Sequence, residues 1–310
     1  MSNYIFDSHC HIQNSSIVEN DRDTLRYEME MPKEYAQAVA KKIQTLPLNS
    51  IGMMGTTIED SRRMGEIVDI LREEKEEKDQ QKKENKELAV KVYYGFGIHP
   101  WFCENTLKNH ENWKQQLENL IIQYPKATIG ECGLDKVARN RATKKPFSMP
   151  IQTEFFEFQF HLAAKYRRPI IIHSVKTVGK LFEFIRRELK SSIDNIPPKI
   201  MFHSYGGSPD ITRSLLNLSS IRDRFYFGFS YFVNSRIQHN PENLSLIPRN
   251  RILIETDFHE MDDVPEAIKQ IHHLLKSYSS WSSSLGISDD DGGHDGNDDG
   301  NDDLYRLTKK

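Results

Sequence analysis

The chain has 310 residues, of which 37% are hydrophobic, 10% aromatic and 28% charged, and its formal net charge is -3. This composition is typical of a globular protein with room for one large core, and no run approaches the roughly 18 consecutive apolar residues that a membrane span requires. The near-neutral charge neither demands nor excludes a nucleic-acid partner, which only a local basic patch would indicate.

Eight short runs of apolar, β-branched or aromatic residues recur along the chain and predict buried strands. Between them lie stretches with helical spacing, such as residues 151–166 and 178–190. Alternation of strands and helices predicts a parallel sheet, and eight such units predict a single-domain α/β protein, a (β/α)8 TIM barrel. The predicted strands are 4–9, 50–56, 92–99, 127–133, 169–174, 199–204, 225–230 and 252–257.

Two segments differ in composition from this pattern. Residues 72–91 mix both charge signs densely, which favours a solvated helix that continues the preceding one. After about Tyr278 the chain turns to serine, glycine and aspartate, with eight aspartates in residues 289–303. Such a composition cannot bury enough apolar surface to fold, so we expect a barrel in residues 1–278 and a disordered acidic tail in residues 279–310.

Cysteine usage and the N-terminus indicate a reducing compartment. Cys10, Cys103 and Cys132 are odd in number, widely spaced and form no CxxC motif, so neither a disulfide framework nor a structural zinc knuckle is expected. The first residues lack the basic and apolar segments of a secretion signal. We therefore expect a cytoplasmic protein without membrane contact, with the nucleus as the alternative location.

Histidines and carboxylates end six of the eight predicted strands. His9 and His11 are two residues apart in the first strand, so their side chains point to the same face. In a barrel of parallel strands the carboxyl ends of all strands meet at one mouth, where active sites are built. The residues that end the strands are His9, His11, His99, Glu131, His173, His203 and Asp257.

Four or more imidazoles and two carboxylates exceed what one tetrahedral ion binds, and they fit two divalent ions that share a carboxylate. The identity of the ions stays open among magnesium, manganese and zinc, because imidazole and carboxylate ligands are mixed. Solitary histidines elsewhere are expected to be ordinary hydrogen-bonded groups, namely His110, His161, His239, His272 and His273.

The chain resembles the TatD family of metal-dependent deoxyribonucleases, which belongs to the amidohydrolase-like superfamily. The matching blocks are "DSHCHIQ", "GIHPW", "IGECGLD", "QTEFFEFQFHLAAKYRRPIIIHS", "FHSYGGS", "FGFS" and "RILIETD", in the family's order over most of residues 4–260. Related amidohydrolases often bridge their metals with a modified lysine at the end of strand 4, where this chain has Glu131. Its branch is similar to fungal cut-nine-interacting proteins, which are named for binding a partner in the cell-division machinery.

The resemblance implies a role for each of these residues. His9, His11, Glu131 and Asp257 would hold one ion, while Glu131, His173 and His203 would hold the other. Asp257 would also be the catalytic base, and His99 would contact the substrate phosphate. Where relatives have a proline-rich turn after strand 8, this chain has Phe258 and His259, so His259 is expected to be a solvent-facing loop residue, with an additional metal ligand as the alternative.

Further substrate contacts are expected at the mouth. Residues 133–146 form a basic loop after Glu131, and its lysines and arginines suit a phosphate backbone, although a solvated surface loop has the same composition. The glycines after strand 6 would present backbone N–H groups to a phosphate, or would form a turn and a helix cap. The predicted substrate contacts are His99, Lys136, Arg139, Ser204 and Gly206.

These features together predict a divalent-metal phosphodiesterase, a deoxyribonuclease that trims the 3' ends of single-stranded DNA. The preference for DNA and the 3'-5' direction rest on the resemblance alone. One alternative is a metallo-amidohydrolase or lactonase that acts on a small molecule. The other is a protein of the cell-division machinery that binds a helical-repeat partner and cleaves nothing.

Overall fold

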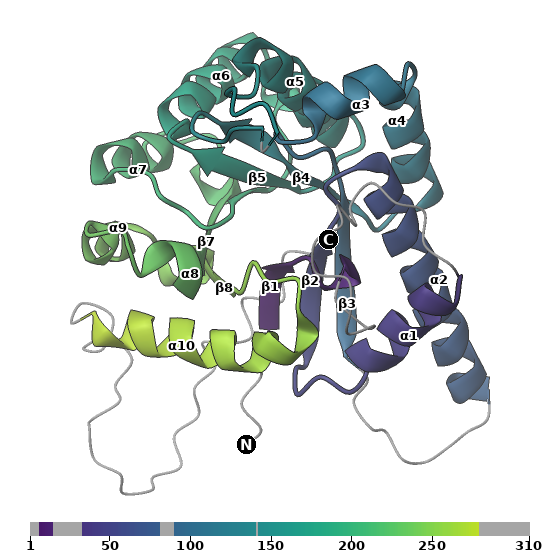
Figure 1. Ribbon diagram of the computed structural model, residues 1–310. Helices are drawn as coiled ribbons and strands as arrows, with labels where there is room; N and C mark the ends of the chain where they lie inside the picture. The colour runs from purple at the N-terminus through teal and green to yellow at the C-terminus, as the bar shows by residue number, and fades with distance from the viewer. Residues whose placement is uncertain (1–5, 15–32, 81–89, 141, 279–310) are drawn as a thin grey trace, which may run out of the picture.

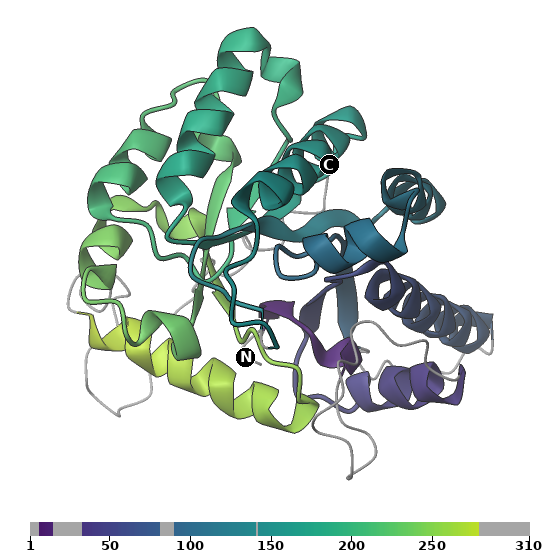
Figure 2. The same ribbon diagram turned by 45° about the horizontal axis from the view of Figure 1, so that its top comes forward.

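The computed structural model describes residues 6–14, 33–80, 90–140 and 142–278. All eight predicted strands are confirmed, and each of the first seven pairs in parallel with the strand that follows it in the chain. The (β/α)8 TIM barrel expected from the sequence is therefore confirmed (Figure 2). The strands are β1 (Phe6–Cys10), β2 (Ser50–Met54), β3 (Lys91–Phe96), β4 (Thr128–Asp135), β5 (Ile170–Val175), β6 (Ile200–Phe202), β7 (Phe225–Ser230) and β8 (Ile252–Glu255).

Helices surround the sheet (Figures 1 and 2). The α-helices are α1 (Lys33–Ile43), α2 (Ile58–Gln80), α3 (Cys103–Asn109), α4 (Trp113–Gln123), α5 (Met149–Lys165), α6 (Val178–Ser191), α7 (Pro209–Leu216), α8 (Tyr231–Asn234), α9 (Asn240–Leu246) and α10 (Val264–Ser277). Short 3₁₀ helices are η1 (Ile12–Asn14), η3 (Ile193–Asn195), η4 (Arg222–Arg224), η5 (Arg249–Arg251) and η6 (Met261–Asp263). Within the described residues, no helix is both long and apolar enough to cross a membrane.

The charged segment 72–91 is helical over only part of its length. Residues 72–80 continue α2 as predicted, residues 81–89 lie outside the described residues, and Lys91 begins β3. The prediction of a helix up to Lys91 was therefore wrong at its end. Lys91 pairs with Ser50, the first residue of β2, so β3 begins at Lys91 and the helix cannot extend to this residue. The predicted acidic tail, residues 279–310, also lies outside the described residues.

Alternation along the strands explains why the predicted site residues face the barrel interior. Ile171, Met201 and Leu253 belong to a buried apolar cluster contributed by five strands. His173, His203 and Glu255 follow these three residues by two positions, so each points to the same side of its strand, nearer the carboxyl end. The apolar cluster therefore forms a floor, and the polar residues lie above it at the mouth. The cluster consists of Met54, Ile171, Met201, Tyr226 and Leu253.

Asp7 connects β1 to the end of β8 where the barrel closes. Its fully buried carboxylate accepts hydrogen bonds from the Thr256 N–H at 3.0 Å, the Thr256 hydroxyl at 2.6 Å and the His9 N–H at 3.2 Å. The Asp257 N–H donates to the His9 carbonyl at 3.0 Å. These bonds fix the backbone of His9 relative to that of Asp257, although the two residues are far apart in the sequence.

Asp7→Ala should lower the free energy of unfolding by at least about 2 kcal/mol, because three buried donors lose their acceptor and each unsatisfied group costs about 1–3 kcal/mol. Urea unfolding followed by circular dichroism measures the change. Asp262→Ala is the matched control, since Asp262 is 82% exposed and its ion pair with Lys42 lies on the surface. Equal stabilities for the two variants would contradict the role of Asp7 in closing the barrel.

Candidate metal centre

Glu131 lies at the centre of the predicted ligands and presents its two oxygens to two different pairs of histidines. Oε2 is 3.1 Å from His11 Nε2 and 3.4 Å from His9 Nε2. Oε1 is 2.8 Å from His203 Nε2 and 2.9 Å from His173 Nδ1. The side chain is 2% exposed, so no bulk solvent separates these groups. The carboxylate therefore has the arrangement that a ligand shared between two ions requires.

Asp257 completes the first of the two groups. Its Oδ1 lies 3.6 Å from both His9 Nε2 and His11 Nε2. Its backbone has a φ of 61°, in the left-handed region that a non-glycine residue adopts only when the surroundings hold it there. The carboxylate is 24% exposed, compared with 2% for Glu131. Asp257 therefore contacts the buried imidazoles and is also open to the barrel mouth.

The donor set fits divalent ions. His9 Nε2 and His11 Nε2 are 3.2 Å apart, and His173 Nδ1 and His203 Nε2 are 3.0 Å apart. Two nitrogens bound to one zinc ion at tetrahedral positions lie about 3.3 Å apart, given Zn–N distances of about 2.0–2.1 Å. Lone pairs at such distances repel each other unless a proton or a cation lies between them. Three groups of side chains could hold a cation: His9, His11 and Glu131; His9, His203 and Asp257; and His99, Glu131 and His173.

The opposite nitrogens of His11 and His173 have hydrogen-bond partners, whereas Nδ1 of His9 and Nδ1 of His203 have none among the described residues. His11 Nδ1 donates to the Met54 carbonyl at 2.8 Å, which leaves Nε2 free to bind an ion. His173 Nε2 lies 3.3 Å from Asp135 Oδ2, and His203 Nδ1 lies 3.5 Å from Glu255 Oε1. Contacts of this kind orient ligating histidines and increase their basicity. Nε2 of His11, Nε2 of His203 and Nδ1 of His173 face Glu131 and are the nitrogens that could bind ions.

His99 takes part in the cluster as a hydrogen-bond donor. The Trp101 N–H donates to His99 Nδ1 at 3.2 Å, so the proton of the neutral ring is on Nε2. Nε2 faces Glu131 Oε1 at 3.4 Å. Burial, with His173 acting in the same direction, lowers the pKa of His99 to about 4 although Glu131 raises it, and the ring is neutral at pH 7. This tautomer suits a phosphate contact better than a metal ligand.

Charge in the centre is balanced between acids and imidazoles. Burial raises the pKa of Glu131, but the imidazoles around it, led by His203 and His99, hold that pKa well below its usual range. Burial lowers the pKa of His11, but Asp257 and Glu131 outweigh it and raise the pKa well above its usual range. A cation that binds here therefore displaces a proton from His11, and affinity for the metal should rise with pH.

The predicted substrate contacts occupy different parts of the mouth. Lys136 and Arg139 are exposed in the loop after β4, where Arg139 Nη1 donates to the Lys144 carbonyl at 3.2 Å. Ser204 Oγ already bonds Ser230 Oγ at 2.7 Å and Glu255 Oε1 at 2.9 Å. Gly206 is exposed just after β6. The basic residues and Gly206 are thus accessible, whereas the Ser204 hydroxyl is engaged by protein groups.

The glycine-rich segment after β6 forms a helix cap. Ser208 Oγ accepts from the Ile211 N–H at 3.4 Å at the start of α7. The Gly207 carbonyl accepts from His239 Nε2 at 2.9 Å and from Asn243 Nδ2 at 2.8 Å. This geometry supports the turn-and-cap interpretation of the segment.

Histidines outside the cluster behave as the sequence predicts. His110 pairs with Glu59 at 2.9 Å and His161 pairs with Glu188 at 2.9 Å. His259 is exposed beside the mouth, and its ring centroid lies 6.5 Å from that of His11. The ion pairs of His110 and His161 are those expected of ordinary polar groups, and the exposure of His259 is that expected of a loop residue at the rim.

Sequence reasoning missed three residues that contact the centre. Asp135 accepts from the Trp101 indole N–H at 2.8 Å with the same oxygen that faces His173. Glu255 faces His203, and Trp101 packs edge-on against His99 with ring centroids 5.0 Å apart. Trp101 and Asp135 end two of the blocks that match the family, "GIHPW" and "IGECGLD", and Glu255 lies two residues before Asp257, but no local pattern shows that these side chains reach the centre.

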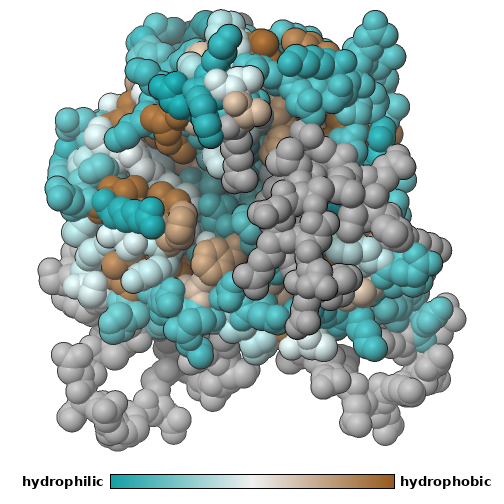
Figure 3. All heavy atoms as spheres, in the orientation of Figure 1, coloured by the Kyte–Doolittle hydropathy of each residue, from teal (hydrophilic) through white to brown (hydrophobic). Residues whose placement is uncertain are grey.

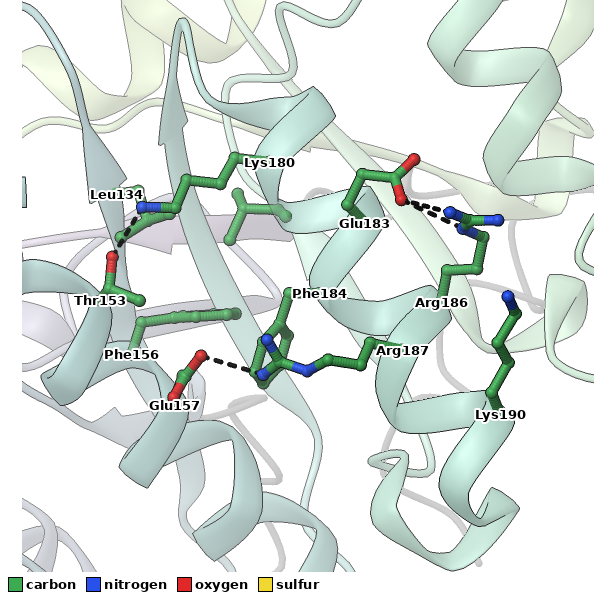
Figure 4. Close-up of a pocket in the computed structure, with 11 residues that line it drawn as sticks. Leu134, Thr153, Phe156, Glu157, Lys180, Glu183, Phe184, Arg186, Arg187 and Lys190 are labelled. Atoms are coloured by element: carbon green, nitrogen blue, oxygen red, sulfur yellow. Dashed lines mark hydrogen bonds and ion pairs between the residues drawn. The ribbon is translucent and has the colours of Figure 1, made fainter. Parts of the chain in front are cut away.

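A separate pocket lies on the outside of the barrel, between α5 and α6, with a volume of about 490 Å³ (Figure 4). Its charged groups are largely paired with each other or with neighbouring polar groups: Arg187 with Glu157 at 3.0 Å, Arg186 with Glu183 at 2.6 Å and Lys180 with Thr153 at 2.9 Å. None of the predicted metal ligands lines it. The metal cluster, rather than this pocket, is therefore the candidate site.

The chain is similar in sequence to known proteins. The family model of TatD-related DNases matches residues 6–278. The Cut9-interacting protein scn1 of Schizosaccharomyces pombe is 27% identical over 271 residues, covering 64% of this chain and 81% of that protein. The 3'-5' ssDNA/RNA exonuclease TatD of Edwardsiella piscicida is 30% identical over 164 residues, covering 52% and 55% of the two chains.

A solved structure has the same fold. The TatD homologue YJJV of Escherichia coli superposes with a TM-score of 0.57, over 88% of this chain and 90% of that chain, at 21% identity.

On the face of the molecule shown in Figure 3, hydrophobic residues form small separate patches among hydrophilic ones.

Proposed function

The chain belongs to the family of TatD-related DNases, and on this premise we propose that it is a two-metal phosphodiesterase that removes nucleotides from the 3' end of single-stranded DNA. Membership makes the protein a metal-dependent hydrolase. The number of ions, the substrate and the direction of cleavage are the proposal.

The position of Glu131 carries the proposal of two ions. Each of its oxygens faces its own pair of imidazoles, at 3.1–3.4 Å for His9 and His11 and at 2.8–2.9 Å for His173 and His203. A single ion would bind to only one of the two histidine pairs. Bound at both, divalent ions would polarise a phosphodiester, lower the pKa of a bound water and stabilise the leaving oxygen.

The protein groups have distinct roles in this proposal. Asp257 accepts the proton of the attacking water, because it is ionised and is the ligand most open to the mouth. His99 donates a hydrogen bond from Nε2–H to a non-bridging phosphate oxygen when substrate replaces the contact with Glu131, and it keeps its proton. Lys136 and Arg139 bind the phosphates of neighbouring nucleotides without reading the bases.

The proposed direction of cleavage and strand preference are based on the activity named for a relative. The TatD protein of E. piscicida is named as a 3'-5' exonuclease of single-stranded DNA and RNA. The corresponding activity is proposed for this chain, in the cytoplasm or the nucleus. Two alternatives have less support: a small-molecule amidase or lactonase does not need the basic loop, and a partner-binding role like that in the name of scn1 does not need an intact ligand set.

Labelled oligonucleotides test the proposal. With the purified chain and Mg²⁺ or Mn²⁺, a 5'-labelled single strand should give a ladder of progressively shorter products, while a 3'-labelled strand should release labelled mononucleotide first. Chelation with EDTA should stop both reactions, and a blunt duplex of the same sequence should react more slowly. Release of 5'-labelled mononucleotide would contradict the direction. Faster turnover of small amides or lactones than of DNA would favour the alternative enzyme class.

A further inference from the structure

Trp101 is an exposed aromatic residue at the edge of the metal centre. It lies in the short segment between β3 and α3, two residues after His99. Its ring is perpendicular to that of His99, and its centroid is 6.3 Å from the ring of His173. Nevertheless 44% of the residue is exposed to solvent. A single exposed apolar side chain is ordinary, so exposure alone does not assign it a function.

Buried polar groups hold this indole in place. Its N–H donates to Asp135 Oδ2 at 2.8 Å, and the same oxygen lies 3.3 Å from Nε2 of the candidate ligand His173. The backbone N–H of Trp101 donates to His99 Nδ1 at 3.2 Å. Turning the ring away from the mouth would break its hydrogen bond to Asp135 and its edge-on contact with the His99 ring. An aromatic surface fixed in this way is available for binding at little further cost in conformational entropy.

The basic loop depends on the same carboxylate. Asp135 Oδ1 accepts from the Val137 and Ala138 N–H groups, each at 2.9 Å, and so fixes the start of the loop that carries Lys136 and Arg139. Asp135 thus places an exposed aromatic surface, exposed positive charge and a candidate metal ligand next to one another. Proteins that bind single-stranded nucleic acid combine the same elements, with bases stacked on aromatic rings and phosphates on basic residues.

We propose that Trp101 stacks on the nucleobase next to the scissile phosphodiester and so makes the site selective for unpaired nucleotides. This inference rests on the proposed function and adds a residue that determines substrate specificity. A base inside a duplex is covered on both faces by its neighbours, so it has no free face for the indole. Only a base at a frayed end or in a single strand stacks on Trp101 without first being unpaired.

Substrates with and without the base provide the test. The full chain with its metal is titrated with a 5'-fluorescein oligonucleotide whose last linkages are phosphorothioates, which keep the strand intact. A second strand carries tetrahydrofuran abasic analogues at the two nucleotides that flank the scissile bond. Fluorescence anisotropy gives Kd. Trp101→Ala should raise Kd for the normal strand about 5- to 150-fold, the range found when a stacking residue is removed, and should change Kd for the abasic strand less than about 2-fold.

Two further variants separate stacking from positioning. Trp101→Phe keeps an aromatic face but loses the N–H that bonds Asp135, so it should retain most of the affinity for the normal strand. Ile122→Ala removes an apolar side chain from α4 that is more exposed than Trp101, and it should change neither Kd. An equal loss of affinity for both strands in Trp101→Ala would show that the indole only positions Asp135, and unchanged affinity for both would show no contact. Either result overturns the proposal.

A parallel cleavage assay with unmodified strands distinguishes this inference from the proposed function. Wild-type protein that prefers the normal strand over the abasic strand through Trp101, but cleaves neither, would refute the nuclease activity and leave base stacking established. Equal cleavage of the normal and abasic strands would support the nuclease activity and refute base stacking on Trp101.

Discussion

Glu131→Gln should lose at least one of the two proposed ions and reduce turnover by more than about 100-fold, the largest cost expected for removing a residue that only hydrogen-bonds to a metal ligand. The amide keeps the shape of the side chain but removes the negative charge that two cations a few ångströms apart need between them. It also places an N–H₂ group against a histidine pair that now faces a carboxylate oxygen. Elemental analysis of the purified variant and its turnover on a single-stranded oligonucleotide measure the two effects.

Glu188→Gln is the matched control for this experiment. Glu188 is also a buried glutamate that faces an imidazole, at 2.9 Å from His161, but it lies on α6 outside the barrel. The control variant should keep its metal content and its turnover. If Glu131→Gln retained two ions per chain and nearly normal turnover, the bridging role would be wrong, whatever the behaviour of the control.

Asp257→Asn should reduce turnover by about 10²- to 10⁴-fold, the usual cost of removing a general base, while metal content falls much less. Burial raises the pKa of Asp257, but His11, His203 and His9 outweigh burial and keep the carboxylate ionised. Asparagine fills the same space and leaves an oxygen that still binds a cation, but it cannot accept a proton. Turnover measured over a titration with added metal separates the two roles.

Asp262→Asn controls for a change of charge near the mouth, because Asp262 follows Asp257 by five residues in η6 and is exposed. It should behave as wild type at every metal concentration. Recovery of Asp257→Asn turnover at high metal concentration would show that Asp257 is a ligand only, and the proton acceptor would have to be sought elsewhere.

The order of elements and most of the ligand set follow from the sequence. Apolar runs gave all eight strands, and the two-residue period placed His9 beside His11 and placed His173 and His203 on the inner face of their strands. These features depend on residues that are adjacent or two apart, so a local pattern contains them. The helix predicted to reach Lys91 was wrong because the start of β3 depends on its pairing with β2 rather than on its own charges.

Only the tertiary structure decided how these groups are oriented. The register of β4 shifts between Ile129 and Cys132, and this shift determines where Glu131 points. His173 is oriented by Asp135, 38 residues away in the chain. Asp7 and Thr256 meet across 249 residues. Contacts between residues so far apart in the chain depend on strand order and register, which no local pattern of residues specifies. The sequence therefore determined which side chains reach the mouth, and the fold decided which atoms face each other there.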